Sequence, residues 1–309
     1  MANSDFDIHH ITAIAGDVGK NVRFYRDLLG LRLVKKTVNF DDPGTYHLYY
    51  GNESGDPGTI LTFFPWSDRG LKGRPGTGQV TGIAFAVPEN ALDFWSGRLG
   101  EAGLSPSEPY RRFEETLICF EDPDGISLEL VAVPGEQRPG WDNGKIPAEM
   151  AIRGFYGVAM SLPFTDGAES LLAERLGYRV TGESANRRRM LSPSGQTRVD
   201  LIADSRIPRG SMGVGAVHHI AWRIGDAGGQ SALREKLLEI GYQVSPVMDR
   251  NYFQSIYFRE PGGVLFEIAT DPPGFTVDEP LEALGKNLRL PPWLESRRRE
   301  IEDHLPKID

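Results

Sequence analysis

Apolar and polar positions follow the same order four times along this chain. In each copy an apolar, strand-like run leads into a segment of helical periodicity, and alternating or β-branched runs follow. A glycine stands just past each helical segment, where a left-handed cap is common, at Gly30, Gly103, Gly177 and Gly241. Each copy then closes with a glycine turn and a further strand. Such internal similarity indicates repeated structural units.

The repeated pattern predicts four βαβββ units and therefore an α+β fold. Joints rich in proline and glycine separate the units, whose approximate limits are 8–66, 79–134, 152–204 and 215–270. The remainder, 271–309, begins with Pro272-Pro273-Gly274. We expect it to end in a charged helix after Pro291 that covers a surface or the mouth of an active site.

Composition narrows the class of protein. At 309 residues the chain exceeds one ordinary core, which agrees with several units. The formal net charge of −9 argues against a nucleic-acid partner, and the single cysteine, Cys119, excludes an internal disulfide or a thiolate metal cluster. No apolar run approaches the about 18 residues of a membrane span, and residues 1–7 carry no export signal. We therefore expect a cytoplasmic protein that does not act at a membrane.

Histidines carry most of the functional information. The chain has six, and four of them form two pairs, in Ile8-His9-His10-Ile11-Thr12 and Val217-His218-His219-Ile220-Ala221. One histidine inside an apolar run is usually a satisfied core or edge residue. Two pairs at matching positions of the first and last units favour a metal ligand in each. Because neighbours on a strand point to opposite faces, His9 and His218 are not expected to be ligands if His10 and His219 are.

Four βαβββ units with these signatures resemble the vicinal oxygen chelate superfamily, which includes glyoxalase I, bleomycin-resistance proteins and extradiol dioxygenases. The resemblance covers nearly the whole chain. It implies that the units pair into two half-open barrels, with ligands projecting inward from the first and last strands of each unit. In this chain those positions are His10 and Thr62, Gly82 and Glu129, Gly157 and Asp200, then His219 and Glu267.

The pairing of the units decides which ligands meet. If units pair in sequence order, the two histidines fall in different barrels. If the first unit pairs with the fourth, one barrel collects His10, His219 and Glu267, a facial triad that leaves three positions of an octahedral ion open. We prefer this arrangement because it uses both histidine pairs. Glu267 also lies in an apolar strand, where a lone carboxylate is costly unless it binds a metal, whereas Glu129 and Asp200 are expected to be solvated or locally bonded.

A closer resemblance covers two stretches, Gly30-Leu31-Arg32-Leu33-Val34-Lys35-Lys36-Thr37-Val38-Asn39-Phe40 and Tyr46-His47-Leu48-Tyr49-Tyr50-Gly51. With the histidine pairs, they are similar to extradiol-type, ring-cleaving dioxygenases that open hydroquinones and chlorohydroquinones. The resemblance implies Fe(II), or else Mn(II), held by His10, His219 and Glu267. It also implies a supporting shell around the ligands, formed by His9, Thr12 and His218, although edge packing explains His9 and His218 about as well.

The same resemblance implies an arginine and a tyrosine on the middle strands of the last unit. Arg250 and Tyr257 fit these positions, with Arg259 and Tyr252 as nearby alternatives. The implied reaction opens a para-diphenol ring with O2 beside a hydroxylated carbon. Tyr257 would act as an acid/base or hydrogen-bond partner, with His218 as a further catalytic group, and Arg250 would hold developing negative charge.

Two other functions are compatible with the same pattern. A glyoxalase-like lyase or isomerase would use a similar barrel with another metal, although Thr62 is then a poor fourth ligand. A non-catalytic protein that binds an aromatic compound or an antibiotic would need no metal at all. The expected partners are a small aromatic substrate and O2. A homodimer is compatible with the sequence, but no stretch identifies an interface.

Overall fold

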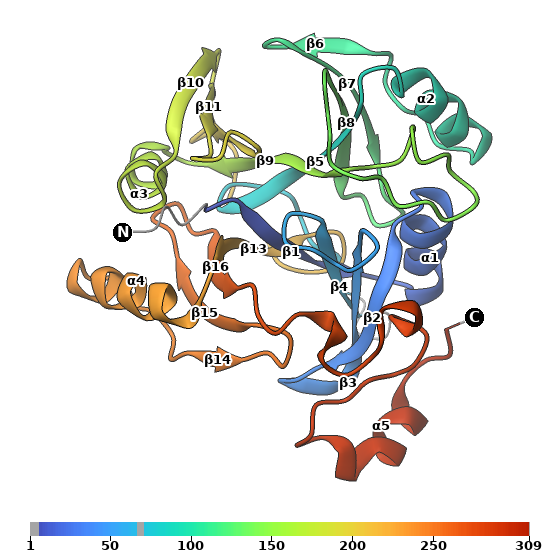
Figure 1. Cartoon of the computed structure of the whole chain (residues 1–309). Coiled ribbons are helices and arrows are strands. Elements are labelled where there is room, and N and C mark those ends of the chain that lie inside the picture. The colour runs from blue at the N-terminus through green and yellow to red at the C-terminus, as the bar shows by residue number, and fades with distance from the viewer. Residues whose placement is uncertain (1–5, 67–70, 309) are drawn as a thin grey trace.

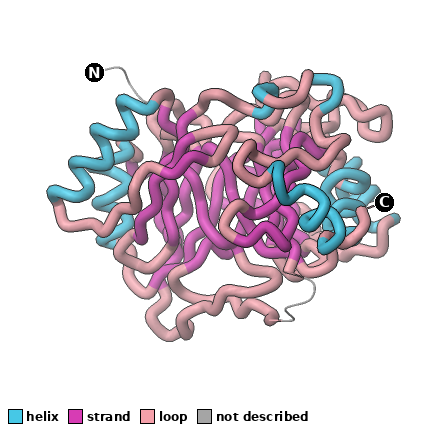
Figure 2. Tube along the Cα trace, turned by 90° about the horizontal axis from the view of Figure 1, so that it is seen from below, coloured by secondary structure: helices cyan, strands magenta, loops and turns pink. Residues whose placement is uncertain are grey.

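Two curled, eight-stranded sheets make up the protein. The computed structural model describes residues 6–66 and 71–308, so most of the N-terminal segment inspected for an export signal lies outside the described residues. The first sheet, in the lower part of Figure 1, has the order β14-β15-β16-β13-β1-β4-β3-β2. The second, above it, has the order β10-β11-β12-β9-β5-β8-β7-β6. Strands fill the centre and helices lie at both ends (Figure 2). The predicted α+β class with two half-open barrels is confirmed.

Each of the first two units runs strand, helix, then three strands. The first contains β1 (Ile8–Ala15), α1 (Val18–Val22), the π-helical η1 (Arg23–Leu28), β2 (Arg32–Asn39), β3 (Asp42–Gly51) and β4 (Ile60–Pro65). The second contains β5 (Gln79–Pro88), α2 (Leu92–Glu101), β6 (Tyr110–Arg112), β7 (Glu115–Glu121) and β8 (Ser127–Val133).

The later units repeat this order. The third contains β9 (Gly154–Leu162), α3 (Asp166–Leu176), β10 (Arg179–Ser184), β11 (Arg187–Leu191) and β12 (Arg198–Ala203). The fourth contains β13 (Val217–Ile224), α4 (Ala227–Glu239), β14 (Met248–Asp249), β15 (Gln254–Arg259) and β16 (Leu265–Thr270). The terminal segment holds η2 (Phe275–Val277), η3 (Leu281–Ala283), η4 (Glu295–Arg297) and α5 (Arg298–His304).

Helix ends follow local capping rather than apolar periodicity alone. Gly177 adopts the left-handed conformation expected past α3. The apolar periodicity of the fourth unit predicts a helix over 231–240, but α4 already begins at Ala227, because the Asp226 carboxylate accepts the backbone N–H of Gly229. The helix expected after Pro291 is short and starts only at Arg298. Among the described residues, no helix is long and apolar enough to cross a membrane.

Pairing of the first strands decides which units share a sheet. β1 runs antiparallel to β13, and β5 runs antiparallel to β9. The first unit therefore shares its sheet with the fourth, and the second unit shares its sheet with the third. Residues of β1 and β13 are thus neighbours although most of the chain separates them.

The segment after β16 is fastened to the first unit by a buried lysine. Lys35 of β2 is fully buried, and its Nζ lies 2.6 Å from Asp278 Oδ1 and 2.6 Å from Glu279 Oε2. The same Nζ donates to the carbonyl of Phe275, whose ring packs on Tyr49 of β3. In Figure 1 this red segment runs beside β2 and β3. It therefore covers the outer side of the first unit.

Replacement of Lys35 by methionine should weaken this attachment strongly. Two carboxylates would lose their buried cation, and breaking a buried ion pair typically costs about 3–5 kcal/mol. We expect a loss of this size in the free energy of unfolding, measured by urea denaturation. Lys20→Met, at an exposed lysine, is the matched control and should change little. Equal stability of the two variants would contradict this role of Lys35.

Candidate metal centre

Three strands bring the predicted ligands together. In the sheet, His10 of β1 is paired with Ala221 of β13, which in turn is paired with Glu267 of β16. Glu267 Oε2 lies 2.8 Å from His219 Nε2 and 3.3 Å from His10 Nε2, and the two Nε2 atoms are 3.4 Å apart. The ligand atoms of all three residues lie within 4.8 Å of one another. One ion could therefore contact all of them.

Contacts behind the ligands fix their orientation. The Nδ1 atoms of His9 and His10 are 2.9 Å apart, and those of His218 and His219 are 2.8 Å apart. Each candidate ligand therefore engages a histidine neighbour through Nδ1 and directs Nε2 to the shared centre. The pairing of β1 with β13 is irregular between Ile8 and His10, so strict alternation does not hold at His9.

The donor set suits a divalent cation. Glu267 is fully buried, and its Oε2 forms no hydrogen bond of good geometry within the described residues. Burial opposes its ionisation, but His10 and His219 outweigh burial and hold the pKa of Glu267 well below its usual value. Burial also lowers the pKa of His219. An ionised carboxylate beside an unprotonated imidazole is the state that metal binding requires.

A cavity of about 360 Å³ opens beside the three ligands. This volume lies at the small end of the range for ligand pockets, roughly 300–1,000 Å³, and suits a single ring with substituents. Its apolar wall consists of Phe40, Phe64, Trp66, Phe253 and Leu265. Its polar groups, apart from the ligands, are Asn39, Asp41, His47, Tyr49, His218, Arg250 and Tyr257.

The cavity shows which of the arginines and tyrosines considered from the sequence lie at the site. Arg250 and Tyr257 both line it, and Arg250 Nε donates to Tyr257 Oη over 3.1 Å. The alternatives lie elsewhere, because Tyr252 donates to Asp278 and exposed Arg259 donates to a backbone carbonyl of its own turn.

The three residues expected to support the ligands lie in different parts of the site. His218 lines the cavity, and burial, reinforced by His219, lowers its pKa to about 3. His9 is buried behind the metal centre, where burial followed by His10 lowers its pKa well below the usual value. Thr12 is buried and accepts a hydrogen bond from Thr62 over 2.8 Å.

Sequence reasoning missed two cavity residues on β3, His47 and Tyr49. Tyr49 is paired with Thr62 in the sheet, as Tyr257 is paired with Glu267. The two tyrosines thus occupy equivalent register positions on the middle strands of the first and fourth units. Aligning these middle strands would have identified Tyr49, whereas nothing in the sequence alone signals the contacts of His47.

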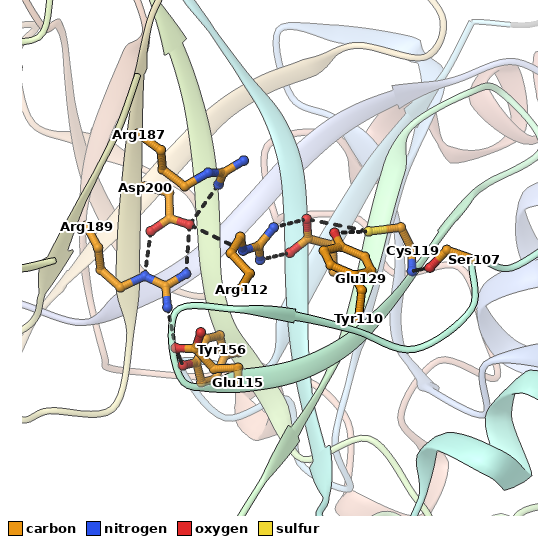
Figure 3. Close-up of polar contacts among 10 residues, drawn as sticks. All are labelled: Ser107, Tyr110, Arg112, Glu115, Cys119, Glu129, Tyr156, Arg187, Arg189 and Asp200. Carbon is orange, nitrogen blue, oxygen red and sulfur yellow. Dashed lines mark hydrogen bonds and ion pairs between the residues drawn. The ribbon is translucent and has the colours of Figure 1, made fainter. Parts of the chain in front are cut away.

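The second sheet has carboxylates but no histidines at the equivalent positions. Gly82 and Gly157 stand where the first sheet has its two candidate histidines. Figure 3 shows Arg112 between the two inward carboxylates, with its Nη1 2.7 Å from Glu129 Oε1 and its Nε 3.9 Å from Asp200 Oδ2. Glu129 and Asp200 are therefore locally bonded rather than solvated.

Further arginines complete this network. Arg189 binds Asp200 through two bonds of 2.7 and 2.8 Å, and Arg187 binds it over 2.7 Å. Arg189 also binds Glu115, to which Tyr156 donates (Figure 3). The space left among these side chains is only about 10 Å³. Guanidinium groups thus occupy the interior of the second barrel, where the first barrel has its candidate metal ligands and cavity.

Fold and site together define a member of a known superfamily. The family model described as Glyoxalase/Bleomycin resistance protein/Dioxygenase superfamily matches residues 7–130 and 159–268. The chain belongs to this superfamily. Glyoxalase I from Zea mays shares the fold, with a TM-score of 0.65 at 14% identity over 91% of this chain and 96% of that one.

Two curated relatives are similar over almost their whole length. The Bacillus subtilis protein named "Putative ring-cleaving dioxygenase MhqO" is 45% identical over 99% of this chain and 97% of its own. The chlorohydroquinone/hydroquinone 1,2-dioxygenase of Sphingobium indicum is 35% identical over 95% of this chain and 94% of its own. A crystal structure of a "putative dioxygenase" from Bacillus subtilis superposes with a TM-score of 0.94 at 44% identity, covering 100% and 99% of the two chains.

Replacing a candidate ligand should abolish metal binding while the fold persists. Loss of a residue that only hydrogen-bonds to a ligand typically lowers metal affinity by up to about 100-fold. We expect His10→Ala and Glu267→Ala, which remove candidate ligands, each to lower it by more than that. Metal content after anaerobic loading and gel filtration measures this, with circular dichroism to monitor the fold. His304→Ala, at an exposed histidine, is the control. Stoichiometric metal in either ligand variant would overturn the assignment.

Removing the central arginine of the second barrel should destabilise the protein. Arg112→Met leaves Glu129 and Asp200 facing each other with less compensating charge. We expect a loss of about 2–3 kcal/mol in the free energy of unfolding, below the usual cost of a buried pair because the side chains keep some exposure. Arg206→Met removes an exposed pair with Asp204 and should change the free energy of unfolding little, because solvent screens that pair. The two unfolding curves, compared directly, test the difference.

Proposed function

We propose that this protein is a ring-cleaving dioxygenase that uses Fe(II) and O2 to open a para-diphenol of the hydroquinone type. The observation that carries the proposal is the His10, His219 and Glu267 centre at the wall of a single-ring cavity. The names of the two curated relatives support the same reaction class. Mn(II) would fit the same donor set. The bond opened would be of the extradiol type, beside a hydroxylated carbon.

The number of ligands favours oxygen chemistry. Two imidazoles and one carboxylate leave three positions of an octahedral ion for other molecules. Fe(II) bound there would supply activation of O2 and of the aromatic diol. The fourth inward position of this barrel is Thr62, whose hydroxyl donates to Thr12 and contacts His47. A glyoxalase-like site with four protein ligands therefore has no ready fourth donor.

Arg250 and Tyr257 form the polar side of the proposed reaction site. Burial raises the pKa of Tyr257, so its side chain remains a phenol. Arg250 keeps its charge, donates to Tyr257 Oη, and forms an ion pair of 3.1 Å with Asp41. A fixed cation beside a neutral phenol can stabilise negative charge that develops on the substrate without reorganisation.

His218 supplies a neutral group on another part of the cavity wall. If His219 binds the metal through Nε2, its Nδ1 carries the proton and donates to His218 Nδ1, 2.8 Å away. The remaining nitrogen of neutral His218, Nε2, then carries a proton of its own. His218 would therefore offer a hydrogen-bond donor to an oxygen in the cavity.

Oxygen uptake on a panel of diphenols tests the proposal. We expect Fe(II)-loaded protein to consume O2 and open the ring of hydroquinone and methylhydroquinone. If catechol were the only diphenol opened, the protein would still be a ring-cleaving dioxygenase, but its substrate would not be a para-diphenol. No uptake with any diphenol, despite stoichiometric bound metal, would overturn the proposal in favour of glyoxalase-type substrates.

Tyr257→Phe should lower the turnover number by roughly 10²–10³-fold, the range for removing one donor to developing charge. The metal content should stay unchanged, because Tyr257 is not a ligand. Arg259→Ala, at an exposed residue of the same strand, is the matched control and should retain turnover. Wild-type turnover in Tyr257→Phe would show that the hydroxyl of this tyrosine has no role in the reaction.

A further inference from the structure

Two tyrosines line the cavity from equivalent strands of the first and fourth units. Tyr49 of β3 is paired with Thr62, and Tyr257 of β15 is paired with Glu267. In the sheet order, β3 and β15 stand symmetrically on either side of the two histidine-bearing strands. The curled sheet therefore presents the two phenols to the cavity from opposite sides of the metal centre.

The two phenols have different hydrogen-bond partners. Tyr257 Oη accepts from the guanidinium of Arg250 over 3.1 Å. Tyr49 Oη lies 2.9 Å from His47 Nδ1, and that ring's Nε2 lies 2.8 Å from Thr62 Oγ1. Tyr257 is thus hydrogen-bonded to a cation, whereas Tyr49 is the last member of a hydrogen-bonded chain of neutral groups.

The direction of this chain follows from its far end. The Thr62 hydroxyl donates to Thr12 Oγ1 over 2.8 Å, so its oxygen accepts from His47 Nε2–H. A neutral imidazole that donates through Nε2 has a lone pair at Nδ1, which must accept from Tyr49 O–H. Burial, followed by the nearby His10, lowers the pKa of His47 well below its usual value, in agreement with a neutral ring.

Tyr49 therefore offers the cavity an oxygen lone pair and not a proton. Its own proton is held by His47, and burial raises its pKa, so it remains a phenol. Its ring is fixed against Tyr252 and Phe275 beneath the C-terminal segment. A hydroxyl that must donate is the complementary group on a ligand.

We propose that Tyr49 accepts a hydrogen bond from the substrate hydroxyl that does not bind the metal, and that His47 is the positioning residue that makes Tyr49 an acceptor. This inference rests on the proposed function and names the feature of the substrate that the site selects. A diphenol with hydroxyls at opposite ends of the ring could place one hydroxyl at the metal centre and offer the other to Tyr49, which lines the same cavity. A methyl ether at the second position cannot donate to Tyr49.

Binding without O2 tests this inference separately from turnover. Hydroquinone and 4-methoxyphenol are titrated calorimetrically into Fe(II)-loaded protein under anaerobic conditions. We expect the wild type to bind hydroquinone about 5–10-fold more tightly, the effect of one net hydrogen bond. Tyr49→Phe should lower the affinity for hydroquinone to that for 4-methoxyphenol. Tyr46→Phe is the matched control, because Tyr46 belongs to the core on the other face of β3 and should keep the preference.

His47 variants test the positioning role. His47→Leu frees the Tyr49 proton, so Tyr49 becomes a donor and the preference should shift toward 4-methoxyphenol. His47→Gln can accept from Tyr49 and donate to Thr62, and should restore the preference for hydroquinone. A purely structural role for His47 would weaken both ligands equally in His47→Leu and leave their ratio unchanged.

The outcomes distinguish the two proposals. Wild-type discrimination that survives Tyr49→Phe would overturn the role of Tyr49 and leave the dioxygenase proposal standing. An unchanged ratio in His47→Leu would overturn the positioning role of His47. Failure of metal-loaded wild type to bind hydroquinone at all would overturn the proposed function and this inference with it.

Discussion

The architecture of the first barrel depends on one buried, ionised carboxylate. Glu267 has no access to water, so its charge must be compensated by groups from neighbouring strands. Its polar neighbours include His10 and His219, which lie far apart in the chain and meet only because β1 pairs with β13, and the three residues together could hold a cation. The cost of an unpaired charge in the core thus couples the pairing of the first and last units to the chemistry of the site.

The second barrel compensates its buried carboxylates with arginine side chains. Its inward carboxylates, Glu129 and Asp200, are bound by arginines that come from the strands of the same sheet. A guanidinium is a permanent cation with a fixed fork of donors, so it neutralises these charges in every state of the protein. It also fills the space that a ligand would need. The second barrel is therefore filled by side chains, whereas the first keeps an open cavity.

Much of the fold and part of the site could be predicted from the sequence. Apolar periodicity revealed the four units, and the doubled histidine pairs singled out His10 and His219 because each stands at the same step of its repeat. The start of α4 was misplaced, since Gly228 and Gly229 hide a helix that Asp226 caps. His47 escaped notice because its partners are set by the register of β3 and β4. Such cross-strand contacts leave no periodic signal in the chain.

Sharing of a sheet by the first and last units also sets an order of assembly during synthesis. The second sheet consists of residues from the middle of the chain, so it can close before the fourth unit has been made. β1 must wait for β13, and the intervening residues enlarge the loop that this pairing closes. The nascent first unit carries its histidine pair and an unpaired strand edge throughout that interval. The candidate metal centre is therefore among the last parts of the protein to form.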